Sequence, residues 1–155
     1  MYYSFYEDKS ANTYSGYKHH HGIKFQIVIN ESSQIKSISK SYSSSIHDKK
    51  LFLSEYRNLS NKINKNLSIL GDKAYSGLEE YNLTIPIKKN ELEYKKDKEL
   101  AKSNNKLIST KRIKIEHIFA YMKNFRILQR LNYYKINKIE LFFNSIANFY
   151  NLSIM

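Results

Sequence analysis

Cysteine is absent from this chain of 155 residues, and proline and glycine are scarce, with one and four copies. Without a thiol, the sequence excludes disulfides, zinc–thiolate sites and cysteine nucleophiles. Acidic residues are also few, since 14 of them stand against 26 lysines and arginines, which gives a formal net charge of +12. Such a surplus on a small domain indicates a polyanionic partner. Nucleic acid is favoured over an anionic membrane surface because no basic amphipathic anchor helix stands out.

Long uninterrupted apolar runs are absent as well. Residues 1–6 are aromatic but have neither a basic flank nor a continuous apolar stretch, so they do not match a signal peptide. The apolar segment 139–155 is interrupted by Glu140 and three asparagines, a spacing that suits a packed helix better than a membrane span. We therefore expect a cytoplasmic protein with no membrane partner, and a hydrophobic content of 41% is sufficient for one globular domain.

Apolar periodicity predicts an α/β fold with a mixed sheet. In residues 22–30 three isoleucines and Phe25 alternate onto one face, and residues 34–42 alternate again with a slip of one residue. The two segments therefore predict an antiparallel hairpin with a bulge or a strand end. The same patterns predict further elements: a helix from about 46 to 63, a short strand at 67–70, a helical turn at 77–81, an edge strand at 83–87, and helices at 107–124 and 135–154. Residues 88–106, the most charged stretch, are expected as a solvated helix or as a loop that orders on binding.

Two acidic residues stand where carboxylates can perform chemistry. Asp72 directly follows the short apolar strand, and the carboxyl ends of strands are where α/β folds bind ligands. Glu116 comes 44 residues later on the predicted helix 107–124, beside its apolar stripe and one turn after Arg112. Taken singly, each residue also has a structural interpretation. Asp72 fits a turn or a cap, and Glu116 fits a helical ion pair with Arg112.

Five sequence blocks resemble, in the correct order, the DDE endonuclease domain of bacterial insertion-sequence transposases. They cover nearly the whole chain from Tyr14 onward, and five ordered blocks are far more specific than one. The blocks are Tyr14-Ser15-Gly16 with Lys18, His21, Ile23 and Lys24; Ser45-Ile46-His47-Asp48-Lys49-Lys50; Leu70-Gly71-Asp72-Lys73-Ala74-Tyr75; Arg112-Ile113-Lys114-Ile115-Glu116-His117-Ile118-Phe119 with residues 122–128; and the closing helix 144–152.

The resemblance implies an RNase H-like fold, a mixed sheet flanked by helices, that acts on DNA. In that family three carboxylates bind two divalent cations, Mg²⁺ or Mn²⁺, for phosphodiester cleavage and strand transfer. On this mapping Asp72 and Glu116 are the second and third catalytic carboxylates and metal ligands. The DNA contacts expected at element ends and target are Arg112, Lys123, Lys73 and Arg126. For Arg112 and Lys123, which share the helix face of Glu116, solvated surface charge is an equally open interpretation.

The family's first aspartate has no clear counterpart in this sequence. The family places it upstream of Tyr14, where only thirteen residues stand here and none ends an apolar strand with Asp-x-Thr. Asp8 is the only aspartate available, in a polar stretch. We therefore expect residues 1–13 to be a remnant segment, and residues 14–155 to be an incomplete catalytic domain that lacks its central first strand and turns over poorly, if at all. A decayed gene remnant is equally compatible.

A missing central strand would leave backbone groups of its neighbours without partners. Residues 2–6, the upstream part of the same transposase, or a second protomer are the expected occupants of that place. Transposases of this kind usually act as dimers on paired DNA ends, so a second protomer is a natural candidate.

Several weaker candidates remain from the sequence. Asp48 fits a helix cap better than an active-site role, and His117, next to Glu116, fits a helix histidine equally well. The histidine tract 19–21 is interpreted as replaced basic residues rather than as a metal site. Two other functions stay open: a noncatalytic DNA-binding module derived from a transposase, and an unrelated basic RNA- or ribosome-associated protein.

Overall fold

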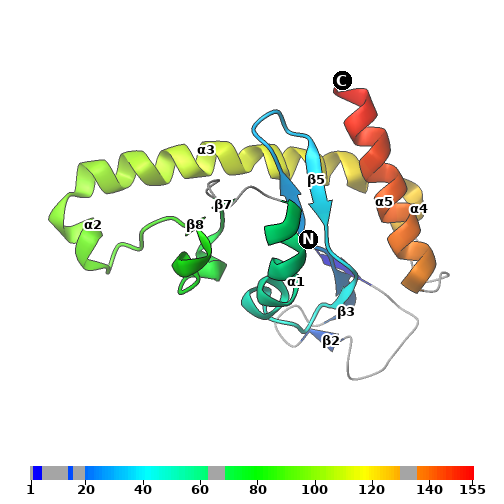
Figure 1. The fold of residues 1–155 in the computed structure, drawn as a ribbon, viewed down its shortest axis with the longest axis horizontal. Helices are drawn as coiled ribbons and strands as arrows, with labels where there is room; N and C mark the ends of the chain where they lie inside the picture. Colours follow the sequence, from blue (N-terminus) through cyan, green and yellow to red (C-terminus); the bar gives the residue numbers. More distant parts are fainter. Residues whose placement is uncertain (1, 5–13, 16–19, 63–68, 130–135) are drawn as a thin grey trace.

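The computed structural model describes residues 2–4, 14–15, 20–62, 69–129 and 136–155 of the chain. One long helix, α3, runs along the molecule; the strands and α1 lie beside its middle, and α5 lies near its C-terminal end (Figure 1). No helix in these ranges has both the length and the apolar character needed to cross a membrane.

Among the described residues, strands dominate the first part of the chain and helices the last part, with α1 and the β7–β8 pair between them. The strands are β1 Tyr2–Ser4, β2 Tyr14–Ser15, β3 His20–Lys24, β4 Ile27–Ile29, β5 Ile35–Ile38, β6 Tyr42–Ser43, β7 Ile69–Leu70 and β8 Leu83–Thr84. The helices are α1 Asp48–Lys62, the 3-10 turns η2 Lys73–Tyr75 and η3 Glu79–Tyr81, α2 Leu92–Lys96, α3 Lys98–Lys123, α4 Arg126–Gln129 and α5 Ile136–Ser153.

The predicted hairpin is confirmed, with a break in each of its arms. β4 pairs antiparallel with β5, and β3 pairs antiparallel with β6 further along the same two arms. Between the two ladders the Ser39 hydroxyl accepts from the Gln26 N–H at 2.8 Å, while the Ser39 N–H donates to the Gln26 carbonyl at 2.9 Å. The expected slip is a register shift between Val28 and Ile29. The Ser39 hydroxyl thus supplies the acceptor for the Gln26 N–H where the backbone ladder is interrupted.

Residues 2–4 occupy the edge of β3 that lies opposite β6. Tyr3 of β1 and Ser43 of β6 both pair with Ile23. A strand residue has one neighbour on each side, so β1 and β6 flank β3 on opposite edges. The chain's own residues 2–4 thus pair with β3, whereas the missing central strand and its occupant stay predictions.

The strands form three small sheets instead of the single mixed sheet expected. β7 and β8 pair in parallel with one another, with Ile69 opposite Leu83, and no other described strand pairs with β7. A parallel pair needs a crossover between its strands, and here the crossover carries the turns η2 and η3. The α/β class is confirmed, whereas the RNase H-like arrangement stays a prediction.

Two apolar cores lie on the two faces of the hairpin. Ile23, Phe25 and Ile27 alternate onto one face and are buried against α3, α4 and α5, where the rings of Phe25 and Phe143 stack with centroids 4.1 Å apart. Val28 points to the other face and packs with Phe52 of α1 and the residues around β7 and β8. The period-two alternation of the sequence therefore divides the apolar residues between two layers of helix.

Two asparagines on helices pair with strand backbone in the same way. Asn151 of α5 accepts from the Ile35 N–H at 2.8 Å and donates to the Ile35 carbonyl at 2.9 Å. Asn105 of α3 forms the same two hydrogen bonds with Ile87, at 2.8 and 2.9 Å. Each amide satisfies both polar groups of one residue, as a neighbouring strand would do.

Helix α3 begins nine residues earlier than the expected 107–124. The Asp97 side chain accepts from the Leu100 N–H at 2.9 Å, and this cap starts the helix at Lys98. The charged stretch 88–106 is therefore mostly helical, as α2 and the first turns of α3. The short helix α4 was not expected from the sequence pattern.

Replacing Phe143 by alanine should lower the free energy of unfolding by about 3–5 kcal/mol, because its buried ring stacks on Phe25 and the cavity would persist. Leu152 on the same helix is 67% exposed, so Leu152→Ala serves as the control and should change stability by less than about 0.5 kcal/mol. Urea unfolding followed by circular dichroism measures both. Equal losses would show that α5 is not packed through Phe143.

Replacing Tyr42 by phenylalanine should reduce stability by about 1–2 kcal/mol at neutral pH, because the Tyr42 hydroxyl donates to the buried Glu55 carboxylate at 2.6 Å. Burial, and then this hydrogen bond, raise the pKa of Tyr42 above its ordinary value of 10.0. A raised pKa contributes stability that is present below pH 10 and disappears as pH rises through the folded-state value. The difference between the two proteins in urea unfolding should therefore shrink above pH 10; a constant difference would contradict it.

Candidate functional site

Asp72 stands at the carboxyl end of β7, where its own side chain caps the next turn and the preceding Gly71 lies close to neighbouring side chains. Its Oδ1 accepts from the Lys73 N–H at 2.5 Å and so caps the turn η2. Gly71 before it is buried, and a Cβ atom there would lie 3.2 Å from Leu83 and 3.3 Å from Tyr75. The capping role expected for an isolated Asp72 is therefore present, and it leaves the second carboxylate oxygen available.

That second oxygen belongs to an ion pair with helix α3. Arg112 donates from Nη2 to Asp72 Oδ2 at 2.9 Å, and the two side chains are 33% and 47% exposed. The sequence offered Glu116, one turn away, as the partner of Arg112; the structure instead pairs Arg112 with Asp72, 40 residues distant in the chain. Both oxygens of Asp72 thus accept hydrogen bonds from protein donors.

Glu116 is exposed on the turn of α3 that follows Arg112. Residues four apart on a helix are neighbours, with Cβ atoms roughly 5–6 Å apart. Arg112 therefore contacts Asp72 through its guanidinium, and Glu116 lies on the next turn of the same helix. The described residues show no ion pair for Glu116.

Two lysines fix the same stretch of α3 against the hairpin. Lys111 pairs with the Glu31 carboxylate at 3.1 Å, and Lys114 donates to the Glu31 carbonyl at 2.5 Å. The hydrogen bond from Lys111 is the main reason why the pKa of Glu31 lies below its ordinary value. Both lysines therefore contact the β4–β5 turn. Of the three cations at positions 111, 112 and 114, it is Arg112 that contacts Asp72.

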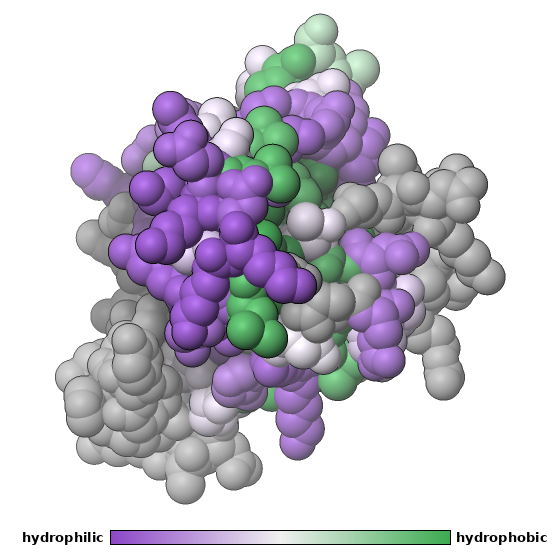
Figure 2. Space-filling view, turned by 90° about the vertical axis from the view of Figure 1, so that its left-hand side faces the viewer, coloured by the Kyte–Doolittle hydropathy of each residue, from purple (hydrophilic) through white to green (hydrophobic). Residues whose placement is uncertain are grey.

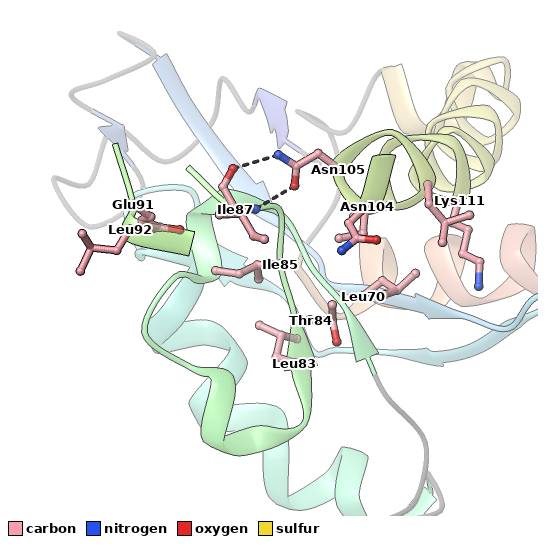
Figure 3. A pocket seen from close by; sticks show the side chains of 12 residues that line it. Leu70, Leu83, Thr84, Ile85, Ile87, Glu91, Leu92, Asn104, Asn105 and Lys111 are labelled. Atoms are coloured by element: carbon pink, nitrogen blue, oxygen red, sulfur yellow. Dashed lines mark hydrogen bonds between the residues drawn. The ribbon is translucent and has the colours of Figure 1, made fainter. Parts of the chain in front are cut away.

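A groove of about 860 Å³ runs between α3 and the β7–β8 pair. Figure 3 shows Asn105 bonded to Ile87 in its wall, with Leu70 and Lys111 also lining it. Its apolar lining is aliphatic, so the groove has no aromatic face for stacking a nucleobase. Seen from the α2 end of the molecule, an apolar band lies between hydrophilic side chains (Figure 2).

Asp48, a weaker candidate from the sequence, has a structural partner. Its Oδ1 lies 2.8 Å from Nζ of Lys24, and Lys24 is buried and also donates to the Ile46 carbonyl at 2.7 Å. Asp48 is the first residue of α1. At this end of the helix, the Lys49 N–H donates to the His47 side chain at 3.3 Å. The ion pair with Lys24 was not foreseen, although Lys24 stands in one of the sequence blocks.

The other predicted residues are spread over the surface. Lys73, Lys123, Arg126 and His117 are exposed, and Lys123 lies about 16 Å along the α3 axis from Arg112 at 1.5 Å per residue. Asp8 and His19 fall outside the described residues, whereas His20 and His21 belong to β3. Within the described ranges, no group of three or more acidic or histidine residues is placed to hold a metal ion.

A family model described as DDE superfamily endonuclease matches residues 6–151 of the chain. The chain belongs to the DDE superfamily endonucleases. The resemblance seen in the five sequence blocks is thereby confirmed, whereas the proposed loss of the segment before Tyr14 stays a prediction. No curated protein and no solved structure matches the chain.

Endonucleases of this superfamily generally use divalent metals, which are bound through carboxylate oxygens. The two candidate carboxylates, Asp72 after β7 and Glu116 on α3, are one fewer than a set of three. Both oxygens of Asp72 accept from N–H groups, and one of the donors is a guanidinium cation. In this arrangement the described residues do not fit a pair of divalent cations.

Replacing Asp48 by asparagine should destabilise the fold by about 2 kcal/mol, because it leaves the Lys24 ammonium buried without its counter-charge. The loss stays below that of a fully buried pair because Asp48 is 33% exposed. Thermal unfolding measures it, and Glu31→Gln, which breaks an exposed pair, is the control with little effect. Unchanged stability in Asp48→Asn would return Asp48 to the list of active-site candidates.

Proposed function

We propose that the chain is the catalytic-domain portion of a DDE transposase, which handles DNA for phosphodiester cleavage and strand transfer. Residues 14–155 form this domain, and on their own they hold an incomplete site. The single observation that supports the proposal is the 2.9 Å contact between Asp72 and Arg112. It brings the carboxyl end of β7 to the turn of α3 that precedes Glu116, which supports the inference that the two carboxylates belong to one site.

Phosphoryl transfer needs positioning and charge neutralisation more than covalent participation by the protein. Asp72 is fixed by the cap of η2 and Glu116 by a helix whose later turns, at Ile118 and Met122, are fully buried. Both carboxylates therefore stand on rigid elements, as a catalytic site requires. We assign them the roles of second and third carboxylate of an RNase H-like site, with the first carboxylate outside the described residues.

DNA contacts are assigned to the cations around this surface. Arg112 contacts Asp72 and Lys73 follows Asp72 in the chain, whereas Lys123 and Arg126 lie at and just after the C-terminal end of α3; three of the four side chains are exposed. Phosphate contacts of this kind give affinity that does not depend on base sequence and that falls as salt rises. The net charge of +12 supports the same conclusion for the chain as a whole.

A noncatalytic DNA-binding module derived from such an enzyme is the second candidate. The observation that favours it is the ion pair itself, since Asp72 is already neutralised by Arg112. Such a module would use the same basic surface and would need neither carboxylate. The two candidates therefore differ in what Asp72 and Glu116 do and agree on DNA as the partner.

Binding and nicking assays separate the candidates. Lys123→Ala and Arg126→Ala should each weaken binding to a short DNA duplex and lower the slope of log affinity against log salt by about one. Lys50→Ala, on the exposed side of α1, removes the same charge elsewhere and should change affinity less. Equal effects of all three substitutions would contradict the proposed surface.

Nicking of supercoiled plasmid in Mn²⁺ then tests the two carboxylates. The proposal expects weak nicking that a chelator stops and that Asp72→Asn or Glu116→Gln abolishes, with DNA binding retained. Binding without any nicking by the original chain would support the noncatalytic module. Nicking that persists in both variants would place the chemistry elsewhere.

A further inference from the structure

The Asp72–Arg112 pair combines two features that a purely structural ion pair does not need. Each carboxylate oxygen accepts a hydrogen bond from an N–H donor, one of them the Arg112 guanidinium, yet the side chains of Arg112 and Asp72 are 33% and 47% exposed. An ion pair this open to solvent contributes little to stability. It is, however, accessible to a competing anion or cation. We propose that Arg112 is a built-in counter-cation of Asp72, which keeps divalent cations off the carboxylate until a DNA phosphate takes the guanidinium. This inference rests on the proposed function.

Helix α3 and the β7–β8 strands, which the Asp72–Arg112 ion pair joins, are each held in place by other contacts. Ile118 and Met122, which are buried in the first core, hold α3 against the hairpin. Asn105 fixes the segment after β8 to α3 through Ile87. The Arg112 side chain can therefore leave Asp72 while the helix and the β7–β8 pair keep their places.

The chemistry of the guanidinium makes the exchange reasonable. Arginine binds carboxylates and phosphates with the same planar arrangement of N–H donors, so a phosphate is a close substitute for Asp72. While Arg112 remains in place, a divalent cation at Asp72 would stand beside a fixed positive charge, which disfavours it. When the guanidinium moves to a phosphate, Asp72 regains a free oxygen and its negative charge. DNA binding and exposure of Asp72 are then coupled, and coupling between two sites is reciprocal.

A double-substitution cycle in EDTA tests the phosphate exchange without any metal. Asp72→Asn releases Arg112 and also removes a negative charge, so it should strengthen binding to a short duplex several-fold, and this gain should fall to the effect of the lost charge alone when Arg112→Gln is also present. Glu116→Gln removes the same charge one helical turn away and should give a gain that does not depend on Arg112. Equal gains from Asp72→Asn with and without Arg112 would overturn the proposal.

Binding of Mn²⁺ to the DNA-free chain, followed by the electron paramagnetic resonance signal of free Mn²⁺, tests the masking of Asp72. Arg112→Gln should tighten Mn²⁺ binding roughly tenfold, since one nearby positive charge is removed. Arg112→Lys, which keeps the charge, should stay near the original chain, as should Lys102→Gln on an exposed part of α3. The gain should disappear in the combination Arg112→Gln with Asp72→Asn.

The outcomes separate this inference from the proposed function. Mn²⁺ binding that Arg112→Gln does not tighten, or a gain that survives Asp72→Asn, would overturn the inference even if the chain binds DNA as proposed. A tenfold gain in a chain that binds no DNA would keep the masking of Asp72 and defeat both the phosphate exchange and the proposed function. Thermal unfolding of each variant establishes that it is folded, and Arg112→Met is the second neutral variant if Arg112→Gln is not.

Discussion

The contact between Arg112 and Asp72 joins the carboxyl end of β7 to helix α3, and the candidate site depends on it. A pair this exposed adds little free energy, so it does not by itself hold the two elements together; it identifies the turn of α3 that faces the carboxyl end of β7. Asn105 makes a second polar contact with the segment after β8, seven residues earlier on α3 and hence two turns away. Between these two contacts lies the aliphatic groove. Two directional contacts thus set the orientation of this small sheet along the helix.

Helix α3 serves both the core and the candidate site, and its burial changes along its length. Ile118 and Met122 are fully buried among the residues of the first core, whereas Glu116, two residues before Ile118, is exposed. A carboxylate on such a helix inherits the rigidity of the packed turns that follow it.

The sheet is where the chain departs most from the family expectation. β3 has strands on both edges because Tyr2–Ser4 pairs beside it, yet β7 pairs only with β8 among the described strands. The hairpin and the β7–β8 pair are therefore joined through side chains, such as the Gln26 amide that donates to the Tyr75 hydroxyl at 3.3 Å. Backbone ladders are replaced here by side-chain contacts, which position the two carboxylates of the described residues without a continuous sheet.

The sequence by itself determined the elements whose signals are local. Alternation of Ile23, Phe25 and Ile27 predicts the hairpin and its buried face, because side chains on a strand point to opposite sides in turn. The ordered blocks predicted the family, which the match to residues 6–151 confirms. Asp72 and Glu116 were candidates for one site from the sequence; the structure pairs Asp72 with Arg112, four residues before Glu116 on α3, and their shared site stays a prediction. The early start of α3 had only a weak local signal, the Asp97 cap.

Only the tertiary structure decided which acidic group Arg112 would choose. A helical sequence offers it Glu116 at the favourable spacing of four residues, and nothing local favours Asp72, 40 residues away. The choice depends on where β7 ends relative to α3, which follows from the packing of Leu83 against Gly71 and from Asn105 binding Ile87. Long-range pairings of this kind arise when separately formed elements dock, and periodicity in one segment carries no information about them.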